Sequence, residues 1–320
     1  MYYKIKKEVN MQVLQNIKQE ISKVIIGHEH LIDSMLISLI TGGHLLVEGV
    51  PGIAKTKSVL TLAKTIGLDF KRVQFTPDLL PSDITGIEIY NPKTNEFEIK
   101  KGPVFTNLLL ADEINRAPAK VQSALLEVMQ EMQVTIANET FKLTPPFLVI
   151  ATQNPIEQEG TYPLPEAQLD RFIMKINVTY NTLEEEILIV KAQNSQEPEQ
   201  VATIEDILNL QKQLNNIHMD EELLKYIAKI THATREPQKY GVETAEYIEY
   251  GASPRATIAM YNCSKAYAMI QNKDYVTPLD IIKVAKDVLR HRIILNYKAE
   301  IDEVTVDKVI NDVIKAIDIP

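Results

Sequence analysis

Residues 44–66 read HLLVEGVPGIAKTKSVLTLAKTI. An apolar run at 44–48 leads into a turn with two glycines at 49–54, and a stretch with helical spacing of its apolar residues follows at 57–66. A strand, a glycine loop, a Lys-Thr pair and a helix, in this order, bring backbone N–H groups and a helix N-terminus to one point, where they bind phosphate. These residues therefore predict a phosphate-binding loop on an α/β fold.

Two side chains of this loop suit a nucleoside triphosphate. We expect Lys55 to reach the β- and γ-phosphates as a point charge and the Thr56 hydroxyl to ligate Mg²⁺. Ala54 stands where the general pattern has glycine, but the flanking strand and helix disfavour the alternative of an ordinary glycine turn. The expected binding residues for ATP in the loop are Gly49, Val50, Pro51, Gly52, Ile53, Ala54, Lys55, Thr56 and Lys57.

Short apolar runs alternate with helical stretches over roughly the first 180 residues. This alternation predicts parallel strands that are covered by helices on both faces of a sheet. Two segments with a period of two, 86–100 and 133–143, predict β-hairpins, which we expect to carry contacts, the alternative being decorative loops. The expected strands are 44–48, 71–75, 107–111, 147–152 and 172–178.

The chain becomes polar around 192–203, which indicates a domain boundary. Helical spacing predominates beyond it, and Ser253-Pro254 and Thr277-Pro278 each combine a capping side chain with a proline in the first helical position. We therefore expect an α/β domain with two hairpin insertions at 1–195 and a helical domain at 196–320. The expected helices of the second domain are 204–214, 221–231, 254–270, 278–292 and 304–317.

Polar residues follow two of the expected strands. Asp112 and Glu113 would lie at the carboxyl edge of the sheet, beside the phosphate loop, where open α/β sheets bind ligands. We expect Asp112 to hold the Mg²⁺ shell and Glu113 to polarise the attacking water. Asn154 follows the next strand, and its amide can hydrogen-bond the water or the γ-phosphate, although an Asn before proline is more often only a turn residue.

Two arginines are candidates for the transferring phosphoryl group, whose charge arginine stabilises. Arg171 stands at the entrance to the last expected strand, and Arg255 stands at the start of a helix in the second domain. We expect Arg255 to reach the nucleotide of its own chain and Arg171 to reach that of a neighbouring chain. Surface ion pairing is the alternative for both.

Composition narrows the class of protein. The net charge of −9 disfavours non-specific wrapping of nucleic acid, which needs clustered Lys and Arg. Cys263 is the only cysteine, so an internal disulfide or a thiolate metal site is not available, and a core position in a reducing compartment is expected. The first ten residues lack the apolar segment of a signal peptide, and the apolar stretch 31–46 is too short to span a membrane. We expect a cytoplasmic protein without membrane insertion.

In this order along the chain, five motifs resemble those of the MoxR family of AAA+ ATPases, and the resemblance covers nearly the whole chain. The motifs are GVPGIAKT at 49–56, LLLADEINRAP at 108–118, ATQNP at 151–155, LPEAQLDRF at 164–172 and GASPRA at 251–256. The family's usual loop itself carries alanine before the lysine, so Ala54 fits this group. The resemblance implies an AAA+ P-loop αβα sandwich with a five-stranded parallel sheet, a C-terminal helical lid and a ring oligomer, usually hexameric, that binds ATP between subunits.

The resemblance also assigns roles by position. Lys55 and Thr56 match Walker A, Asp112 and Glu113 match Walker B, Asn154 matches sensor 1, Arg171 the arginine finger and Arg255 sensor 2. Ile26, Gly27 and His28 match the segment that packs on adenine, and His28 stands where many relatives have glutamine. The hairpins match the helix-2 insert and the pre-sensor-1 hairpin. Arg116, in the INRAP stretch, is an alternative to Arg171 for the neighbouring site.

MoxR-like proteins resemble chaperones that assemble or activate partner complexes, commonly with von Willebrand factor A domain proteins. The leading hypothesis is therefore an ATP-driven remodelling ring whose hairpins push on a client protein. An ATP-switched binding scaffold with little turnover is one alternative. A nucleic-acid motor is another, but the first hairpin has only Lys93, Lys100 and Lys101 nearby. A small-molecule kinase would need an acceptor pocket, and the helical domain offers no obvious one.

Overall fold

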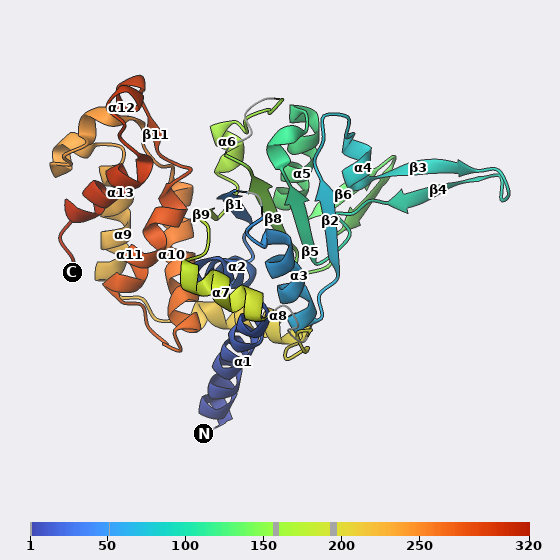
Figure 1. The fold of residues 1–320 in the computed structure, drawn as a ribbon, viewed down its shortest axis with the longest axis horizontal. Coiled ribbons are helices and arrows are strands. Elements are labelled where there is room, and N and C mark those ends of the chain that lie inside the picture. The colour runs from blue at the N-terminus through green and yellow to red at the C-terminus, as the bar shows by residue number, and fades with distance from the viewer. Residues whose placement is uncertain (1, 51, 156–159, 193–196) are drawn as a thin grey trace.

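The computed structural model describes residues 2–50, 52–155, 160–192 and 197–320, with side chains from Gln12 onward (Figure 1). The strands are β1 (Leu45–Gly49), β2 (Phe70–Gln74), β3 (Gly86–Asn91), β4 (Glu96–Lys101), β5 (Leu108–Asp112), β6 (Gln133–Ile136), β7 (Glu139–Lys142), β8 (Leu148–Gln153), β9 (Met174–Val178), β10 (Ile248–Tyr250) and β11 (Ile294–Leu295). The helices are α1 (Tyr2–Val24), α2 (Glu29–Thr41), α3 (Lys55–Ile66), α4 (Pro81–Thr85), α5 (Ala119–Glu131), α6 (Glu166–Leu169), α7 (Leu183–Lys191), α8 (Ile204–Gln213), α9 (Glu221–Ala233), α10 (Pro254–Ile270), α11 (Pro278–Leu289), α12 (Tyr297–Ile301) and α13 (Val306–Lys315).

Five strands form one parallel sheet in the order β2-β5-β8-β1-β9. The carboxyl ends of all five strands therefore lie along one edge of the sheet. Helices cover both faces, α8 packs against α1 and α2, and α9 to α13 form a lid beside β9 (Figure 1). The predicted five-stranded αβα sandwich with a C-terminal helical lid is confirmed.

The strands are apolar on both sides because both faces are buried. Alternate residues of β1 show this: Leu45 and Val47 join a cluster with α1, α2 and α3, whereas Leu46 joins a cluster with α5 and the β6–β7 hairpin. Successive side chains of a strand point to opposite faces, so one apolar run serves two cores. The first cluster continues into the lid.

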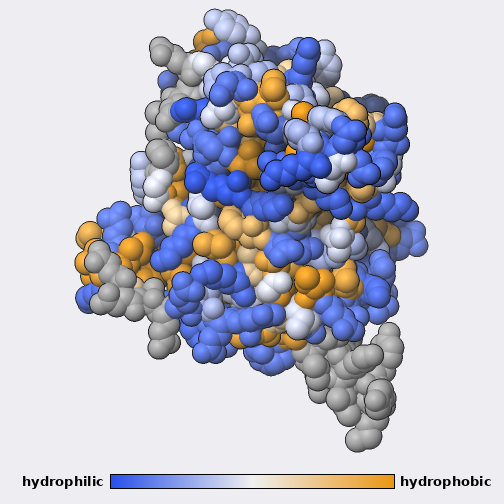
Figure 2. Space-filling model, turned by 90° about the vertical axis from the view of Figure 1, so that its right-hand side faces the viewer, coloured by the Kyte–Doolittle hydropathy of each residue, from blue (hydrophilic) through white to orange (hydrophobic). Residues whose placement is uncertain are grey.

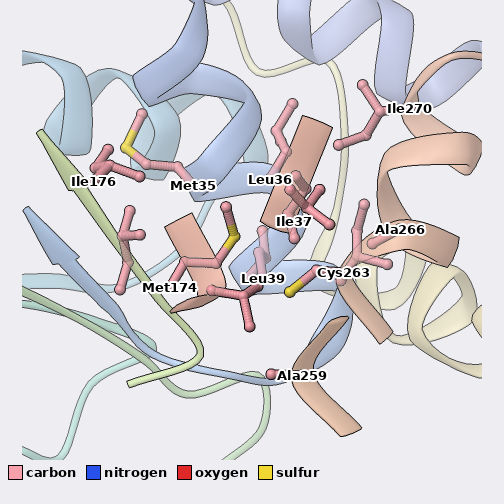
Figure 3. Packing of buried hydrophobic residues seen from close by; sticks show 14 of the residues in the cluster. Met35, Leu36, Ile37, Leu39, Met174, Ile176, Ala259, Cys263, Ala266 and Ile270 are labelled. Carbon is pink, nitrogen blue, oxygen red and sulfur yellow. The ribbon is translucent and has the colours of Figure 1, made fainter. Parts of the chain in front are cut away.

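Helix α2 is apolar nearly all round, as expected for a helix that is buried on every side. In Figure 3, Met35 of α2 points toward Ile176 of β9. Leu39 lies beside Cys263 of α10 on another side of α2. The helix thus joins the sheet to the lid, and Cys263 is a fully buried core residue, as predicted.

The lid also contacts the sheet through polar groups. Arg292, which follows α11, donates to the backbone oxygens of Phe172 and Ile173 and pairs with Asp170 at 2.6 Å. Arg290 donates to the backbone oxygen of Lys175 at 2.7 Å. These contacts fix the lid against the amino end of β9. The sequence prediction extended α11 to residue 292, but the helix ends at Leu289. The next three residues instead make hydrogen bonds to backbone oxygens in and just before β9.

Both predicted hairpins are present. The β3–β4 hairpin projects from the body of the molecule, and the β6–β7 hairpin lies against α5 (Figure 1). The antiparallel pair β10–β11 and the short helix α12 have no counterpart in the sequence prediction, because elements of two, three and five residues carry too little periodicity to detect. The predicted division between residues 195 and 196 falls within 193–196, outside the described residues, and it stays a prediction. Within the described part of the chain, no helix has both the length and the apolar content needed to cross a membrane.

His44 is a buried histidine that joins three segments of the α/β core. Its Nδ1 accepts from the backbone N–H of Val149 at 3.1 Å, so its Nε2 carries the proton and donates to the Met129 oxygen at 3.1 Å. Burial lowers the pKa of His44 from 6.5 to about 4. The neutral form is therefore the one that the fold accepts.

This burial predicts a pH dependence of stability. Protonation below pH 6.5 favours the unfolded chain, so the stabilisation is complete above that pH and is lost as the pH falls toward about 4. We expect the free energy of unfolding to fall by about 2 kcal/mol between pH 7 and pH 5 on account of this group. Urea unfolding of the wild type, of His44→Gln and of the exposed control His218→Gln measures it. An equal pH slope in the wild type and His44→Gln would contradict the assignment.

Candidate functional site

The phosphate loop joins β1 to α3 and has a backbone that restricts its residues. A side chain at Gly49 would come within 2.6 Å of the backbone oxygen of Val178. Gly52 has φ +85°, in the left-handed region that glycine adopts most readily. Ala54 also has a positive φ, 56°, which costs a non-glycine residue about 1–2 kcal/mol. Pro51 lies outside the described residues.

The loop opens onto a pocket of about 460 Å³ at the carboxyl edge of the sheet. Among the described residues, those that line it come from four elements next to one another in the fold: the loop with the start of α3, β2, the end of β5 and the end of β8. They are residues 52–57, Arg72, Gln74, Asp112, Glu113, Thr152 and Asn154. The structure thus brings the predicted loop, the two acids and Asn154 together.

Lys55 lies half-buried between the loop and the acids. Its Nζ donates to the backbone oxygen of Gly49 at 2.5 Å. Burial lowers the pKa of Lys55, while the carboxylates of Asp112, Glu113 and Glu48 oppose this shift. The charge is therefore held inside the pocket by the surrounding acids, in a place where a phosphate would meet it.

Each oxygen of Asp112 already has a partner. Oδ1 accepts from the Thr152 hydroxyl at 2.6 Å, and Oδ2 accepts from Arg72 Nη2 at 2.6 Å and from Arg72 Nε at 3.1 Å. Thr152 also accepts from the backbone N–H of Glu113 at 2.9 Å. The hydroxyl of Thr152 therefore holds the carboxylate of Asp112 and the backbone of Glu113 at the end of β5.

Glu113 is held by two side chains. Gln74 donates to its Oε2 at 2.7 Å, and Arg116 Nε lies 2.9 Å from the same oxygen. Its backbone has φ 54°, another left-handed non-glycine residue, and such residues occur often in functional sites. Arg116 thus contacts an acid of its own chain. Asn154 is 8% exposed at the end of β8, within the same pocket.

Ile26, Gly27 and His28 do not line this pocket, but they lie at the same edge of the sheet. The amide of Asn181 donates to the Ile26 oxygen at 3.1 Å, and Asn181 follows shortly after β9, whose Val178 pairs with Gly49. A side chain at Gly27 would meet Asn181 and Glu185. The buried Nε2 of His28 has no hydrogen-bond partner among the described residues.

Arg171 and Arg255 lie at the other edge of the sheet. Both line a second hollow of about 230 Å³, together with His44, which precedes β1. Arg171 Nη1 donates to the Leu126 oxygen at 2.7 Å, and Arg255 is exposed at the start of α10. The five-residue strand β1 lies between this hollow and the phosphate loop. A parallel strand of this length spans about 16 Å, so the two arginines lie about this far from the loop.

The expectation that Arg255 reaches the nucleotide of its own chain is therefore not met in this arrangement. Asp170 explains why the two arginines lie together. It accepts from the Ser253 hydroxyl at 2.8 Å and pairs with Arg292, so the lid holds α10 against the segment that carries Arg171. Both arginines therefore lie at the edge of the sheet opposite the pocket of their own chain.

Comparisons with known proteins agree with this geometry. The family model described as ATPase family associated with various cellular activities (AAA) matches residues 44–174, and the AAA lid domain model matches residues 242–313. The chain is 48% identical over 304 residues to chaperone MoxR1 of Mycobacterium tuberculosis. This alignment covers 94% of this chain and 81% of MoxR1. The chain belongs to the MoxR family of AAA+ ATPases.

Two further relatives extend the match within this family. YeaC of Bacillus subtilis is 43% identical over 306 residues, covering 94% of this chain and 93% of YeaC. The crystal structure of a candidate ATPase from Cytophaga hutchinsonii is 50% identical and has a TM-score of 0.94, covering 100% of this chain and 98% of that one. The agreement in structure includes the lid as well as the sheet.

Three polar residues of this MoxR-family pocket were not singled out from the sequence: Arg72, Gln74 and Thr152. Thr152 lies in the predicted ATQNP motif, so its neighbours could have pointed to it. Arg72 and Gln74 lie on an edge strand between charged and apolar residues, and only the pairing of β2 with β5 brings them to the acids.

The residues of the pocket fit Mg²⁺ bound together with a nucleotide. Magnesium usually takes one or two carboxylates and completes its shell with phosphate oxygens and waters. In the pocket, Asp112 offers a carboxylate and Thr56 a hydroxyl that fit such a shell. No cluster of three or more His, Cys, Asp or Glu residues able to hold a metal is found in the part of the chain that the structure describes.

Proposed function

We propose that this MoxR-family protein binds and hydrolyses ATP with Mg²⁺ between two copies of the chain in a ring, and that it uses the cycle to remodel a client complex. We propose a hexameric ring from the resemblance to the family alone. One observation carries the proposal: Lys55 and the two acids share one pocket, whereas Arg171 and Arg255 lie at the opposite edge of the sheet. We call the edge of the sheet that carries Arg171 and Arg255 the arginine edge. A second copy of the chain with its arginine edge against this pocket would complete the site.

Each residue has a proposed part. Lys55 and the loop amides hold the phosphates, and Thr56 and Asp112 hold Mg²⁺, which would neutralise charge on the phosphoryl oxygens. Glu113 takes a proton from the attacking water, and Asn154 orients that water or the γ-phosphate. Ile26, Gly27 and His28 pack on adenine, and the unpartnered Nε2 of His28 supports a polar contact with the base.

The family supports a proposal for the partner, and the free cysteine supports a proposal for the cellular compartment. MoxR1 is named a chaperone, and we propose chaperone-like maturation or activation of a partner complex, with a von Willebrand factor A domain protein as the partner. A cytoplasmic location fits Cys263, a buried thiol without a disulfide.

ATP turnover by the purified protein tests the proposal. It is measured with Mg²⁺ over a range of protein concentrations in which oligomers form, against a Glu113→Gln control. Turnover no higher than that of the control would contradict hydrolysis and favour the alternative of an ATP-switched scaffold.

The β3–β4 hairpin is the proposed contact with the client. Tyr90 and Phe97 are paired in register, their ring centroids lie 5.4 Å apart, and their exposures are 49% and 67%. Exposed aromatic pairs are typical of protein interfaces. The hairpin carries acids beside its lysines, so it lacks the basic surface that a nucleic-acid motor needs.

We expect the double variant Tyr90→Ser/Phe97→Ser to keep ATP turnover and to bind the von Willebrand factor A domain partner at least about tenfold more weakly, because aromatic residues dominate interface energies. Titration of a labelled partner by fluorescence anisotropy measures this. The matched control is Thr94→Ser/Glu96→Gln on the same hairpin. Equal partner affinity in both double variants would contradict the proposed contact.

A further inference from the structure

Arg72 enters the pocket from the edge strand β2. It pairs with Leu110 of β5, and Gln74 pairs with Asp112, so Arg72 and Gln74 lie on the same face as the acid. Lys71 lies on the other face of the strand. Arg72 is the only arginine among the described residues that line the pocket.

The guanidinium of Arg72 holds Oδ2 of Asp112, for which no other partner is found among the described residues. Arg72 Nη2 lies 2.6 Å from Oδ2 and also donates to Gln74 Oε1 at 3.0 Å, while Oδ1 is taken by Thr152. A cation that binds Asp112 through Oδ2 must therefore compete with Arg72. The side chain of Arg72 is 48% exposed, and half-exposed ion pairs are weak enough to exchange.

The order of the strands indicates which part of a bound nucleotide Arg72 would meet once it no longer pairs with Asp112. The adenine segment lies beside β9, the phosphate loop follows β1, and β5 and β2 come beyond β8. A nucleotide that runs from adenine to phosphates along this edge points its terminal phosphate at the β5–β2 side. Arginine binds phosphate through two parallel N–H groups, which a lysine cannot do.

We propose that Arg72 is a phosphate-binding residue of its own chain, which neutralises Asp112 in the nucleotide-free pocket and binds the terminal phosphate of ATP once Asp112 is engaged by the divalent cation. This assignment rests on the proposed function. It differs from the parts of Arg171 and Arg255, because Arg72 acts on the nucleotide of the same chain.

Nucleotide binding, without turnover, tests the assignment. Fluorescent ATP and ADP analogues are titrated with Mg²⁺ into the wild type, Arg72→Ala, Arg72→Gln and the control Lys71→Ala. We expect both Arg72 variants to bind the ATP analogue about tenfold more weakly, the usual size of a lost charge-assisted hydrogen bond, and the ADP analogue less than about threefold more weakly. Lys71→Ala should match the wild type for both.

A second measurement follows the cation alone. Mn²⁺ binding to the nucleotide-free protein, read by electron paramagnetic resonance, should be at least about threefold tighter in Arg72→Ala, because Oδ2 of Asp112 is then free of its competing cation. Circular dichroism checks that the variants are folded. Arg72→Gln loses the charge but keeps an N–H donor near the position of Arg72 Nε, and it gives the readout if Arg72→Ala is not folded.

The outcomes separate the two proposals. An unchanged ratio of ATP to ADP affinity in both Arg72 variants, with unchanged Mn²⁺ binding, would overturn the assignment of Arg72 and leave the proposed function standing. A wild type that binds neither nucleotide would contradict the proposed function, and the assignment of Arg72 with it.

Discussion

A Glu113→Gln variant is expected to bind ATP as tightly as the wild type and to hydrolyse it at least about 100-fold more slowly, since a general base contributes about 10²–10⁴ to the rate. Glutamine has nearly the shape of glutamate, and its amide can keep one of the contacts that Gln74 and Arg116 make with Glu113. The pocket should therefore keep its geometry and lose only the acceptor for the proton of water.

The comparison for this variant is Lys55→Ala. We expect it to abolish detectable ATP binding, because it removes the charge that lies between the loop and the acids. Nucleotide affinity and steady-state phosphate release, measured on the same preparations, separate the two effects. Wild-type turnover in Glu113→Gln would remove Glu113 from its proposed part.

An Arg171→Ala variant is expected to bind ATP normally and to lose about 10³-fold or more in turnover, the usual effect of removing an arginine that acts from a neighbouring subunit. The reason is its position: Arg171 lies at the edge of the sheet opposite the loop of its own chain. In the proposed ring, a second chain brings it to the phosphates.

Mixing of subunits measures this directly. Arg171→Ala subunits keep an intact loop, and Lys55→Ala subunits keep an intact arginine, so mixed rings contain complete sites that neither variant forms alone. We expect turnover to reappear on mixing. Arg116→Ala is the matched comparison: Arg116 pairs with Glu113 of its own chain, so mixing with Lys55→Ala should not rescue it. No rescue of Arg171→Ala would count against the assignment in trans.

Local patterns were enough to predict the sheet, the loop and its partners. The five apolar runs became strands of the central sheet, and the Lys-Thr pair begins α3, because each signal lies within a few consecutive residues. Asp112 and Asn154 could be predicted for the same reason, as each follows a buried run.

Other features depend on contacts between distant segments. Arg72 and Gln74 have meaning only once β2 is known to pair with β5, an order that the sequence does not state. The position of Arg255 depends on how Asp170 binds Ser253 and Arg292, segments that lie more than 80 residues away in the chain. Sequence motifs placed Arg255 near a nucleotide, and only the docking of the lid shows that it lies away from that of its own chain.

The most direct test of the account is a cryo-electron microscopy structure of the assembled protein with Mg²⁺ and a non-hydrolysable ATP analogue. The account predicts the terminal phosphate between Lys55 of one chain and Arg171 of the next, with Glu113 facing the phosphate. An empty loop, or an occupied loop with no arginine edge of a second chain beside it, would contradict it.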